Sequence, residues 1–107
     1  MGIKQSTEQE LASFLKENPE WTVQTEKLHR EFVFGDFRGA FGFMSEIALV
    51  AERSDHHPEW SNVYNKVMVD LTTHEAGRIT QRDFELAATM SEVAARKICT
   101  DTKLEQR

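Results

Sequence analysis

Hydrophobic residues in this chain recur with a helical spacing in three places and with the two-residue spacing of strands between them. The first helical segment has Leu11, Phe14 and Leu15 at the i, i+3 and i+4 positions of one helix face. Ser6-Thr7-Glu8-Gln9 precedes it and resembles a capping box, with Ser6 as the N-cap. We expect Asn18-Pro19 to end this short amphipathic helix.

Two strands are predicted after this helix. Trp21-Thr22-Val23 alternates between apolar and polar residues, and the alternation continues through Leu28, Phe32 and Phe34. The apolar side changes from odd to even positions between the two segments. We therefore predict a hairpin with its turn near Thr25 to Lys27.

A long helix is predicted next, because apolar residues hold one stripe over four turns. The stripe consists of Phe37, Ala40, Phe41, Met44, Ile47, Ala48 and Ala51. Glu52 falls at the edge of this stripe. Pro58 disfavours a helical conformation in the residue before it, so the helix should end near Asp55 to His57.

A second hairpin follows the long helix. Residues 60–64 and 67–73 have strand-like composition, and Asn65-Lys66 between them is a plausible two-residue turn. In this interpretation Tyr64 and Val67 flank the turn and face the same way.

The last predicted helix starts at the capping sequence Thr80-Gln81-Arg82-Asp83 and runs to about Cys99, before a polar tail. Its apolar residues form two stripes. The first contains Phe84, Ala87, Ala88, Ala94, Ala95 and Ile98, and the second contains Leu86, Met90 and Val93. A monomer of this size can cover one stripe with its own sheet, so we expect the second to meet a partner chain.

The predicted order of elements is helix, strand, strand, helix, strand, strand, helix. This order indicates an α+β fold of two layers with an antiparallel sheet. The length of 107 residues fits one domain over residues 1–107. A hydrophobic share of 39 % beside 29 % charged residues favours a folded globular protein over a disordered one.

Charge and cysteine content narrow the function classes. A net charge of −5 weakens any claim of direct binding to nucleic acid, because a phosphate backbone attracts positive charge. No apolar run approaches the roughly 20 residues that span a bilayer, so we expect no membrane segment. Cys99 is the single cysteine and cannot form an internal disulfide, which is typical of a reducing compartment. We expect a cytoplasmic protein.

Three of the four histidines lie close together in the sequence, in Asp55-His56-His57-Pro58 and at His74. A histidine with a pKa of about 6.5 both gives and takes a proton near neutrality. The histidine pair precedes the second predicted hairpin and His74 follows it. The two ends of an antiparallel hairpin lie side by side, so we expect the three imidazoles to converge. Glu52 and Asp55 would then orient the rings or hold a ligand N–H.

Each of these residues also has an ordinary structural interpretation. His56 and His57 fit polar residues after a helix C-terminus, and His29 fits a solvated strand residue. Asp83 fits a capping partner, and Trp21 fits the core. A zinc site with three histidine ligands and a water is the sharper alternative. Adjacent histidines seldom point the same way in an extended chain, so we expect no metal.

The histidines and acids form a spaced pattern that is similar to a known family. Glu52-x3-His56-His57-Pro58-x5-Tyr64-x9-His74-x8-Asp83 resembles the signature of the pterin-4a-carbinolamine dehydratases. Residues 36–44 and 56–67 resemble the same family. The resemblance covers essentially residues 20–98 and shows no departure at the signature positions.

The resemblance implies a fold, an assembly and an activity. The fold would be a four-stranded antiparallel sheet with helices packed on one face, assembled as a homotetramer. The reaction would be dehydration of a 4a-hydroxytetrahydropterin to the quinonoid dihydropterin, which recycles tetrahydrobiopterin after aromatic amino acid hydroxylases. No cofactor is implied, because the ring nitrogen's lone pair drives the loss of water.

The resemblance also implies roles for individual residues. His56 and His74 would be the acid/base pair, and His57 beside them would bind the pterin substrate. Glu52 and Asp55 would hold the N–H groups of the pterin or the imidazoles. Two further residues, Trp21 and Asp83, would border the pocket.

Two other functions stay open. Some family members bind a homeodomain transcription factor as a dimerisation cofactor, which would add a nuclear location, and Leu86, Met90 and Val93 would suit such an interaction module. A pterin-binding protein without turnover is the second alternative. His56 and His74 argue against it, since binding alone does not need two titrating groups.

Overall fold

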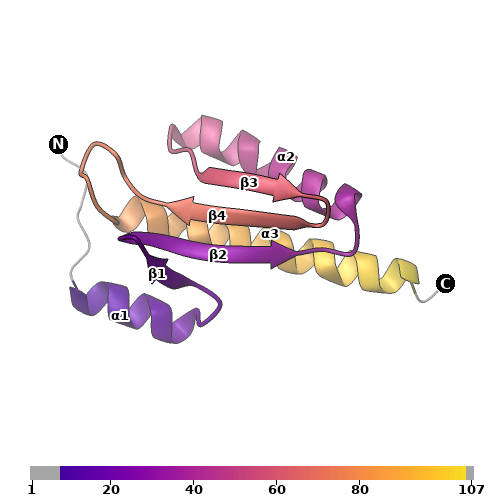
Figure 1. Cartoon of the computed structure of the whole chain (residues 1–107), viewed down its shortest axis with the longest axis horizontal. Helices are drawn as coiled ribbons and strands as arrows, with labels where there is room; N and C mark the ends of the chain where they lie inside the picture. The colour runs from indigo at the N-terminus through magenta and orange to yellow at the C-terminus, as the bar shows by residue number, and fades with distance from the viewer. Residues whose placement is uncertain (1–7, 106–107) are drawn as a thin grey trace.

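Three helices and four strands follow one another in the predicted order in this computed structural model (Figure 1). The structure describes residues 8–105, and it describes side chains for residues 8–97. The elements are α1 (Glu8–Glu17), β1 (Thr22–Gln24), β2 (Lys27–Val33), α2 (Phe37–Ser54), β3 (Glu59–Val63), β4 (Lys66–Leu71) and α3 (Gln81–Glu105). The predicted N-cap Ser6 lies outside the described residues.

The four strands form one antiparallel sheet in the order β1-β2-β4-β3. The two hairpins are joined by pairing of β2 with β4, in which Leu28 faces Leu71 and Phe32 faces Val67. These four side chains and Val69 are all at most 2 % exposed. They form the inner face of the sheet, while the alternate residues face outward.

The first hairpin has the predicted turn. Thr25 and Glu26 connect β1 to β2, and both have positive φ angles, of 53° and 63°. A two-residue turn with left-handed conformations at both positions matches the twist of the flanking strands. The prediction of a turn near Thr25 to Lys27 is therefore confirmed.

The second turn lies one residue earlier than predicted, at Tyr64-Asn65. The amide group of Asn62 donates to the carbonyls of Tyr64 and Lys66, and that of Asn65 donates to the carbonyl of Phe34. These hydrogen bonds hold Tyr64 in the turn with φ 52° and 62 % exposure. A shift of one residue moves a side chain to the other face, so Tyr64 does not share the inward face of Val67.

Helix α2 begins after Asp36, whose Oδ1 accepts the backbone N–H of Gly39 at 3.1 Å. Its buried face consists of Gly39, Ala40, Phe43, Ile47 and Ala51. Phe37 and Phe41 from the predicted stripe are 46 % and 53 % exposed. The buried stripe is thus rotated from the predicted one, and part of the apolar surface of α2 remains uncovered.

The prediction of a partner-facing stripe on α3 is wrong. Leu86, Met90 and Val93 are at most 4 % exposed and belong to the same core as Ala87 and Ala94. These positions form one broad arc of the helix, because the sheet, α1 and α2 together cover more of its circumference than a sheet alone. The helix also extends to Glu105 rather than ending near residue 99, since no glycine or proline interrupts residues 100–105.

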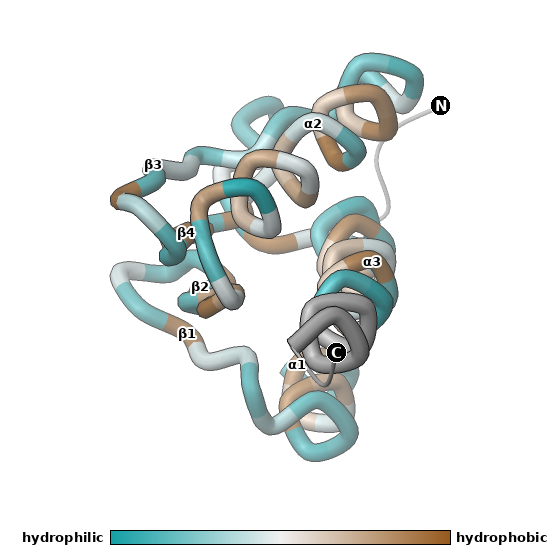
Figure 2. The backbone as a smooth tube through the Cα atoms, turned by 90° about the vertical axis from the view of Figure 1, so that its right-hand side faces the viewer, coloured by the Kyte–Doolittle hydropathy of each residue, from teal (hydrophilic) through white to brown (hydrophobic). Residues whose placement is uncertain are grey.

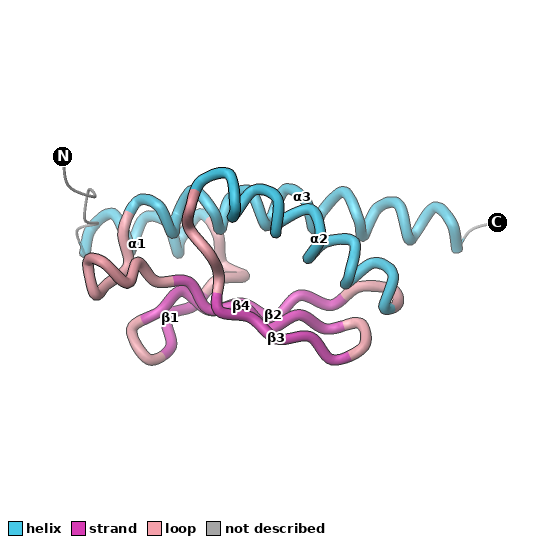
Figure 3. The backbone as a smooth tube through the Cα atoms, turned by 90° about the horizontal axis from the view of Figure 1, so that it is seen from above, coloured by secondary structure: helices cyan, strands magenta, loops and turns pink. Residues whose placement is uncertain are grey.

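All three helices lie on one face of the sheet (Figure 3), which confirms the two-layer α+β fold. Figure 2 shows α2, α3 and α1 side by side in one layer, with the strands beside them. Helix α1 is attached to α3 by stacking of Phe14 on Phe84, with ring centroids 4.8 Å apart. Among the described residues, no helix is both long enough and apolar enough to cross a membrane.

Candidate active site

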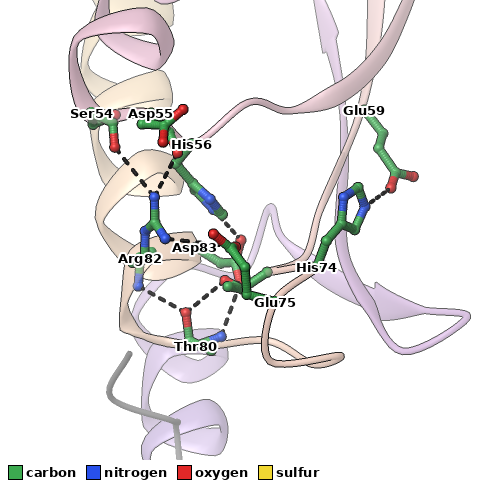
Figure 4. Close-up of polar contacts among 10 residues, drawn as sticks. Ser54, Asp55, His56, Glu59, His74, Glu75, Thr80, Arg82 and Asp83 are labelled. Carbon is green, nitrogen blue, oxygen red and sulfur yellow. Dashed lines mark hydrogen bonds and ion pairs between the residues drawn. The ribbon is translucent and has the colours of Figure 1, made fainter. Parts of the chain in front are cut away.

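His56 lies directly after α2, at a sharp change in chain direction. Asp55 ends the helix in the left-handed conformation, with φ 54° and ψ 44°. The backbone N–H of His56 donates to the carbonyl of Ala51 at 3.0 Å, and Pro58 disfavours further helix. The side chain of His56 turns back toward the start of α3 and is almost fully buried (Figure 4).

Asp83, in the first turn of α3, is the hydrogen-bond partner of His56. Its side chain is fully buried, and its Oδ1 lies 2.7 Å from Nε2 of His56. Its Oδ2 accepts the backbone N–H of Thr80 and the hydroxyl of Thr73, each at 2.9 Å. Three donors therefore surround this carboxylate, which is the arrangement that stabilises a buried negative charge.

The hydroxyls of Thr73 and Thr80 form an ordered chain. Their Oγ1 atoms are 2.7 Å apart, and Oγ1 of Thr80 also accepts the backbone N–H of Arg82 at 3.2 Å. Because Thr73 gives its single hydroxyl proton to Asp83, the proton of Thr80 must point to Thr73. The segment that carries His74 is thereby fixed to the same carboxylate as His56.

This geometry determines which nitrogen of His56 is available for chemistry. An ionised carboxylate only accepts hydrogen bonds, so Nε2 of His56 carries a proton toward Asp83. Nδ1 is left to accept a proton, or to donate one when the ring is charged. A carboxylate–imidazole pair of this kind also holds the ring in one orientation and stabilises the imidazolium.

His57 and His74 have similar partners at the surface. Nε2 of His57 lies 3.0 Å from Oε1 of Glu52, and Nε2 of His74 lies 2.8 Å from Oε2 of Glu59. The side chains of His57 and His74 are 56 % and 74 % exposed, unlike that of His56. Each of the three histidines therefore meets its own carboxylate through Nε2. The Nδ1 atom of each ring takes no part in that contact.

The hairpin of β3 and β4 brings the segments that carry His56 and His74 to the same end of the sheet, which is only part of the convergence of three rings expected from the sequence. Glu59 at the start of β3 faces Asp70 near the end of β4, and the hydrogen bond from His74 to Glu59 joins the two ends. The rings point to different carboxylates in Figure 4. No hydrogen bond among the described side chains joins one of these rings to another.

A cavity of about 270 Å³ lies beside His56. Its walls include Val50 and Ser54 of α2 and Arg82 and Glu85 of α3, but neither His57 nor His74. His56 is thus the member of the histidine group that borders this space between the two helices.

Asp55 and Trp21, two predicted substrate-binding residues, make contacts that hold the fold together. The backbone carbonyl of Asp55 accepts a hydrogen bond from Nη2 of Arg82 at 2.6 Å, which attaches the end of α2 to α3. Trp21 is 2 % exposed, and its indole N–H donates to Oγ of Ser91 at 3.0 Å. In this structure Trp21 is part of the core.

Sequence reasoning missed the partners of two histidines and of Asp83. Two of these partners stand next to the signature residues in the sequence. Glu59 follows Pro58 immediately, and Thr73 directly precedes His74. His29 was interpreted as solvated, but its Nδ1 lies 2.9 Å from Oδ1 of Asp70 on the outer face of the sheet. Pairing across strands is set by register, which the sequence alone did not reveal.

The part of the chain that the structure describes contains no group of three or more His, Cys, Asp or Glu side chains placed to hold a metal ion. A zinc site would need His56, His57 and His74 on one ion. Their Nε2 atoms instead meet three separate carboxylates.

Comparisons of the sequence with known proteins point to one family. The family model described as pterin 4 alpha carbinolamine dehydratase matches residues 4–93. A relative from Solibacter usitatus is 56 % identical over 89 residues, which cover 83 % of this chain and 94 % of the relative. A relative from Rhodopseudomonas palustris is 50 % identical over 95 residues, which cover 87 % and 94 %. The names of both relatives place them among the pterin-4-alpha-carbinolamine dehydratases.

A solved structure agrees with the sequence comparisons. The crystal structure of a transcriptional coactivator/pterin dehydratase from Brucella melitensis superposes with a TM-score of 0.81 at 42 % sequence identity. The superposition covers 85 % of this chain and 99 % of that chain.

Proposed function

Since this chain belongs to the pterin 4 alpha carbinolamine dehydratase family, we propose that it converts 4a-hydroxytetrahydropterin to quinonoid dihydropterin and water, in the recycling of tetrahydrobiopterin. The observation that supports this reaction best is the buried His56–Asp83 pair. It holds an imidazole in one orientation and leaves Nδ1 for proton transfer. The whole chain would act as one dehydratase domain.

The reaction needs two proton transfers and no covalent intermediate. One proton goes to the leaving 4a-hydroxyl, and one leaves the ring nitrogen whose lone pair drives cleavage of the C–O bond. We assign these transfers to His56 and His74, each through its Nδ1. General acid–base assistance of this kind typically accelerates a reaction by about 10²–10⁴-fold.

The remaining residues would bind or position. His57, with Glu52 beside it and Asp55 nearby, would hold the pterin at the exposed side of the site. Asp83 and Trp21 have almost no exposed surface, so we assign them to supporting the site from the core rather than to touching the substrate.

A coupled assay tests the proposal directly. A hydroxylase generates the 4a-hydroxytetrahydropterin, and formation of the quinonoid dihydropterin is followed with and without this protein. Acceleration that survives a metal chelator is the expected result. Formation at the uncatalysed rate would end the proposal, and activity lost to the chelator and restored by zinc would favour the metal alternative.

We also propose that the chain assembles with copies of itself, as a tetramer. The supporting surface is on α2, where the exposed rings of Phe37 and Phe41 lie 5.4 Å apart. Phe41→Glu should shift the sedimentation coefficient to that of a smaller species. The control Gln24→Glu adds the same charge at an exposed position of β1 and should leave the sedimentation coefficient unchanged. Monomeric wild-type protein in the same experiment would contradict the assembly.

The alternative function is binding to a transcription factor as a dimerisation cofactor. It is supported by the description of the Brucella melitensis protein as a transcriptional coactivator/pterin dehydratase. The residues that the sequence predicts for this role, Leu86, Met90 and Val93, are in the core, so the exposed face of α2 is the better candidate. Pull-down with a helical dimerisation segment, beside the dehydratase assay, separates the two functions. We place the enzyme in the cytoplasm, and the coactivator role would add the nucleus.

A further inference from the structure

The hydrogen-bond partner of His74 on the sheet, Glu59, is not among the signature positions of the family. We propose that Glu59 positions His74 for proton transfer and that Lys27 balances the charge of Glu59, so that the three side chains act as one unit. This inference rests on the proposed function, because it gives Glu59 a role only if His74 takes part in the reaction.

Both oxygens of Glu59 are in use. Oε1 accepts a hydrogen bond from Nζ of Lys27 at 2.6 Å, and Oε2 accepts one from Nε2 of His74 at 2.8 Å. A carboxylate held at both oxygens cannot rotate without breaking one of these bonds. The side chain of His74 is otherwise largely exposed, so the orientation of its ring and the proton on Nε2 follow from Glu59.

Lys27 reaches Glu59 from β2, a strand that does not pair with β3, the strand of Glu59. β4 lies between β2 and β3, so the Lys27 side chain crosses the outer face of the sheet, where Asp70 also attracts it. Glu59 and Asp70 face each other directly in the register and would repel each other. β2 supplies a basic residue to each: Lys27 to Glu59, and His29 to Asp70 at 2.9 Å.

The charges in this unit are mutually stabilised. The hydrogen bond from Lys27, followed by that from His74, lowers the pKa of Glu59 below its ordinary value. The hydrogen bond with Glu59 raises the pKa of Lys27 above its ordinary value. Lys27 and Glu59 therefore stay ionised near neutral pH and cancel each other in charge. His74 is the third side chain of this unit, and histidine is the residue type that ordinarily exchanges a proton near neutrality.

The balance between the charges of Lys27 and Glu59 matters, because a general acid–base residue works best when it exchanges its proton near the working pH. Glu59 without Lys27 would favour the protonated ring of His74, and Lys27 without Glu59 would favour the neutral ring. Further charged or titratable groups lie nearby: Asp70 and His29 on the neighbouring strands, Glu75 beside His74 in the loop, and Arg78, which pairs with Thr73 across that loop. Asp70 bonds to His29 and Glu75 pairs with Arg82, whereas the His74 ring bonds to Glu59.

Two variants, Lys27→Met and Glu59→Gln, test this unit by moving the His74 titration in opposite directions. NMR titration of the His74 ring in the substrate-free protein should shift to higher pH in Lys27→Met and to lower pH in Glu59→Gln, each by about half a pH unit. The limb of the pH–kcat profile that follows His74 should move in the same directions. A purely structural role of either side chain would not produce opposite shifts.

Matched controls remove the same charges elsewhere on the outer face. Lys66→Met and Glu31→Gln, on β4 and β2, should leave the His74 titration where it is in the wild type. The NMR signals of the histidine rings are first assigned one by one, so that the titration of His29 is not confused with that of His74. Urea unfolding midpoints for all variants check that each protein is folded.

The outcomes separate this inference from the proposed function. Titrations that stay at the wild-type position, or that move in the same direction in both variants, overturn the unit even if His74→Ala is impaired in turnover. Wild-type turnover in His74→Ala removes His74 from the proposed reaction and this role of Glu59 with it, whatever the titrations show.

Discussion

His56 and His74 each donate to a carboxylate, but the two pairs lie in opposite surroundings. The His56–Asp83 pair is buried, and Asp83 receives two further hydrogen bonds from residues 73 and 80. The His74–Glu59 pair is at the surface, and its carboxylate receives a lysine instead. Removing one partner from a buried pair is costly for folding, whereas an exposed pair contributes little. The same contact therefore stabilises the fold in one case and only orients a ring in the other.

The comparison also shows how the two rings are linked. Thr73 bonds to Asp83, and the next residue is His74. The buried carboxylate thus fixes the position of the His56 ring and of the backbone from which the exposed ring extends. We interpret the site as one rigid imidazole and one surface imidazole attached to a common support.

Removal of Asp83 should have the largest effect on stability. Asp83→Ala leaves His56, the Thr73 hydroxyl and the Thr80 N–H without their acceptor, and should lower the free energy of unfolding by about 3–5 kcal/mol. Glu59→Ala breaks the surface pair and should cost no more than about 1 kcal/mol. Urea unfolding at pH 7 measures both. Equal losses in the two variants would contradict the contrast between the pairs.

Removal of the Thr73 hydroxyl should have a smaller effect. Thr73→Val deprives Asp83 of one donor and Thr80 of its acceptor, and should lower the free energy of unfolding by about 1–3 kcal/mol. Turnover should fall with little change in KM, because the support of His56 is loosened. Thr72→Val is the matched control, since it makes the same replacement at the adjacent half-buried position. If Thr72→Val lost as much stability and turnover as Thr73→Val, the hydrogen bonds of Thr73 to Asp83 and Thr80 would not explain the effect.

The smallest expected effect is the loss of the surface pair in acid. The pKa of Glu59 is lowered in the folded protein, so its contribution is present above the unfolded value of about 4.3 and is lost as the pH falls through the folded value. The stability difference between wild type and Glu59→Gln, below about 1 kcal/mol at pH 5.5, should shrink toward pH 3. Urea unfolding across this range measures it. A difference that grows in acid would have the wrong sign for a depressed pKa.

Local patterns predicted most of the fold. The stop of α2 before Pro58 and the first hairpin depend on neighbouring residues, and both were placed correctly. The second turn was misplaced by one residue, because the side chain of Asn65 bonds to Phe34, which is distant in the sequence. The prediction of two separate apolar stripes on α3 is wrong for a similar reason. A helix covered by a sheet and by two flanking helices buries a broader arc than its own periodicity suggests.

The family signature marked the histidines and Asp83 as candidates, but it did not indicate the whole set of contacts that the structure shows among them. Lys27 and Glu59 meet across an intervening strand, so no sequence spacing indicates their contact. Asp83 could be predicted as a helix cap or as a site residue, and the structure shows one carboxylate bonded to both Thr80 and His56. Register and burial, rather than residue type, decide these roles.

The central claim is that His56 and His74 transfer the protons of the dehydration. The measurement that tests it most directly is kcat for His56→Ala, His74→Ala and the double variant, with enzymatically generated 4a-hydroxytetrahydropterin as substrate. Each single variant should lose about 10²–10⁴-fold in kcat, and the double variant should be about as slow as the slower single one. His57→Ala should mainly raise KM. Wild-type turnover in the double variant would contradict the account.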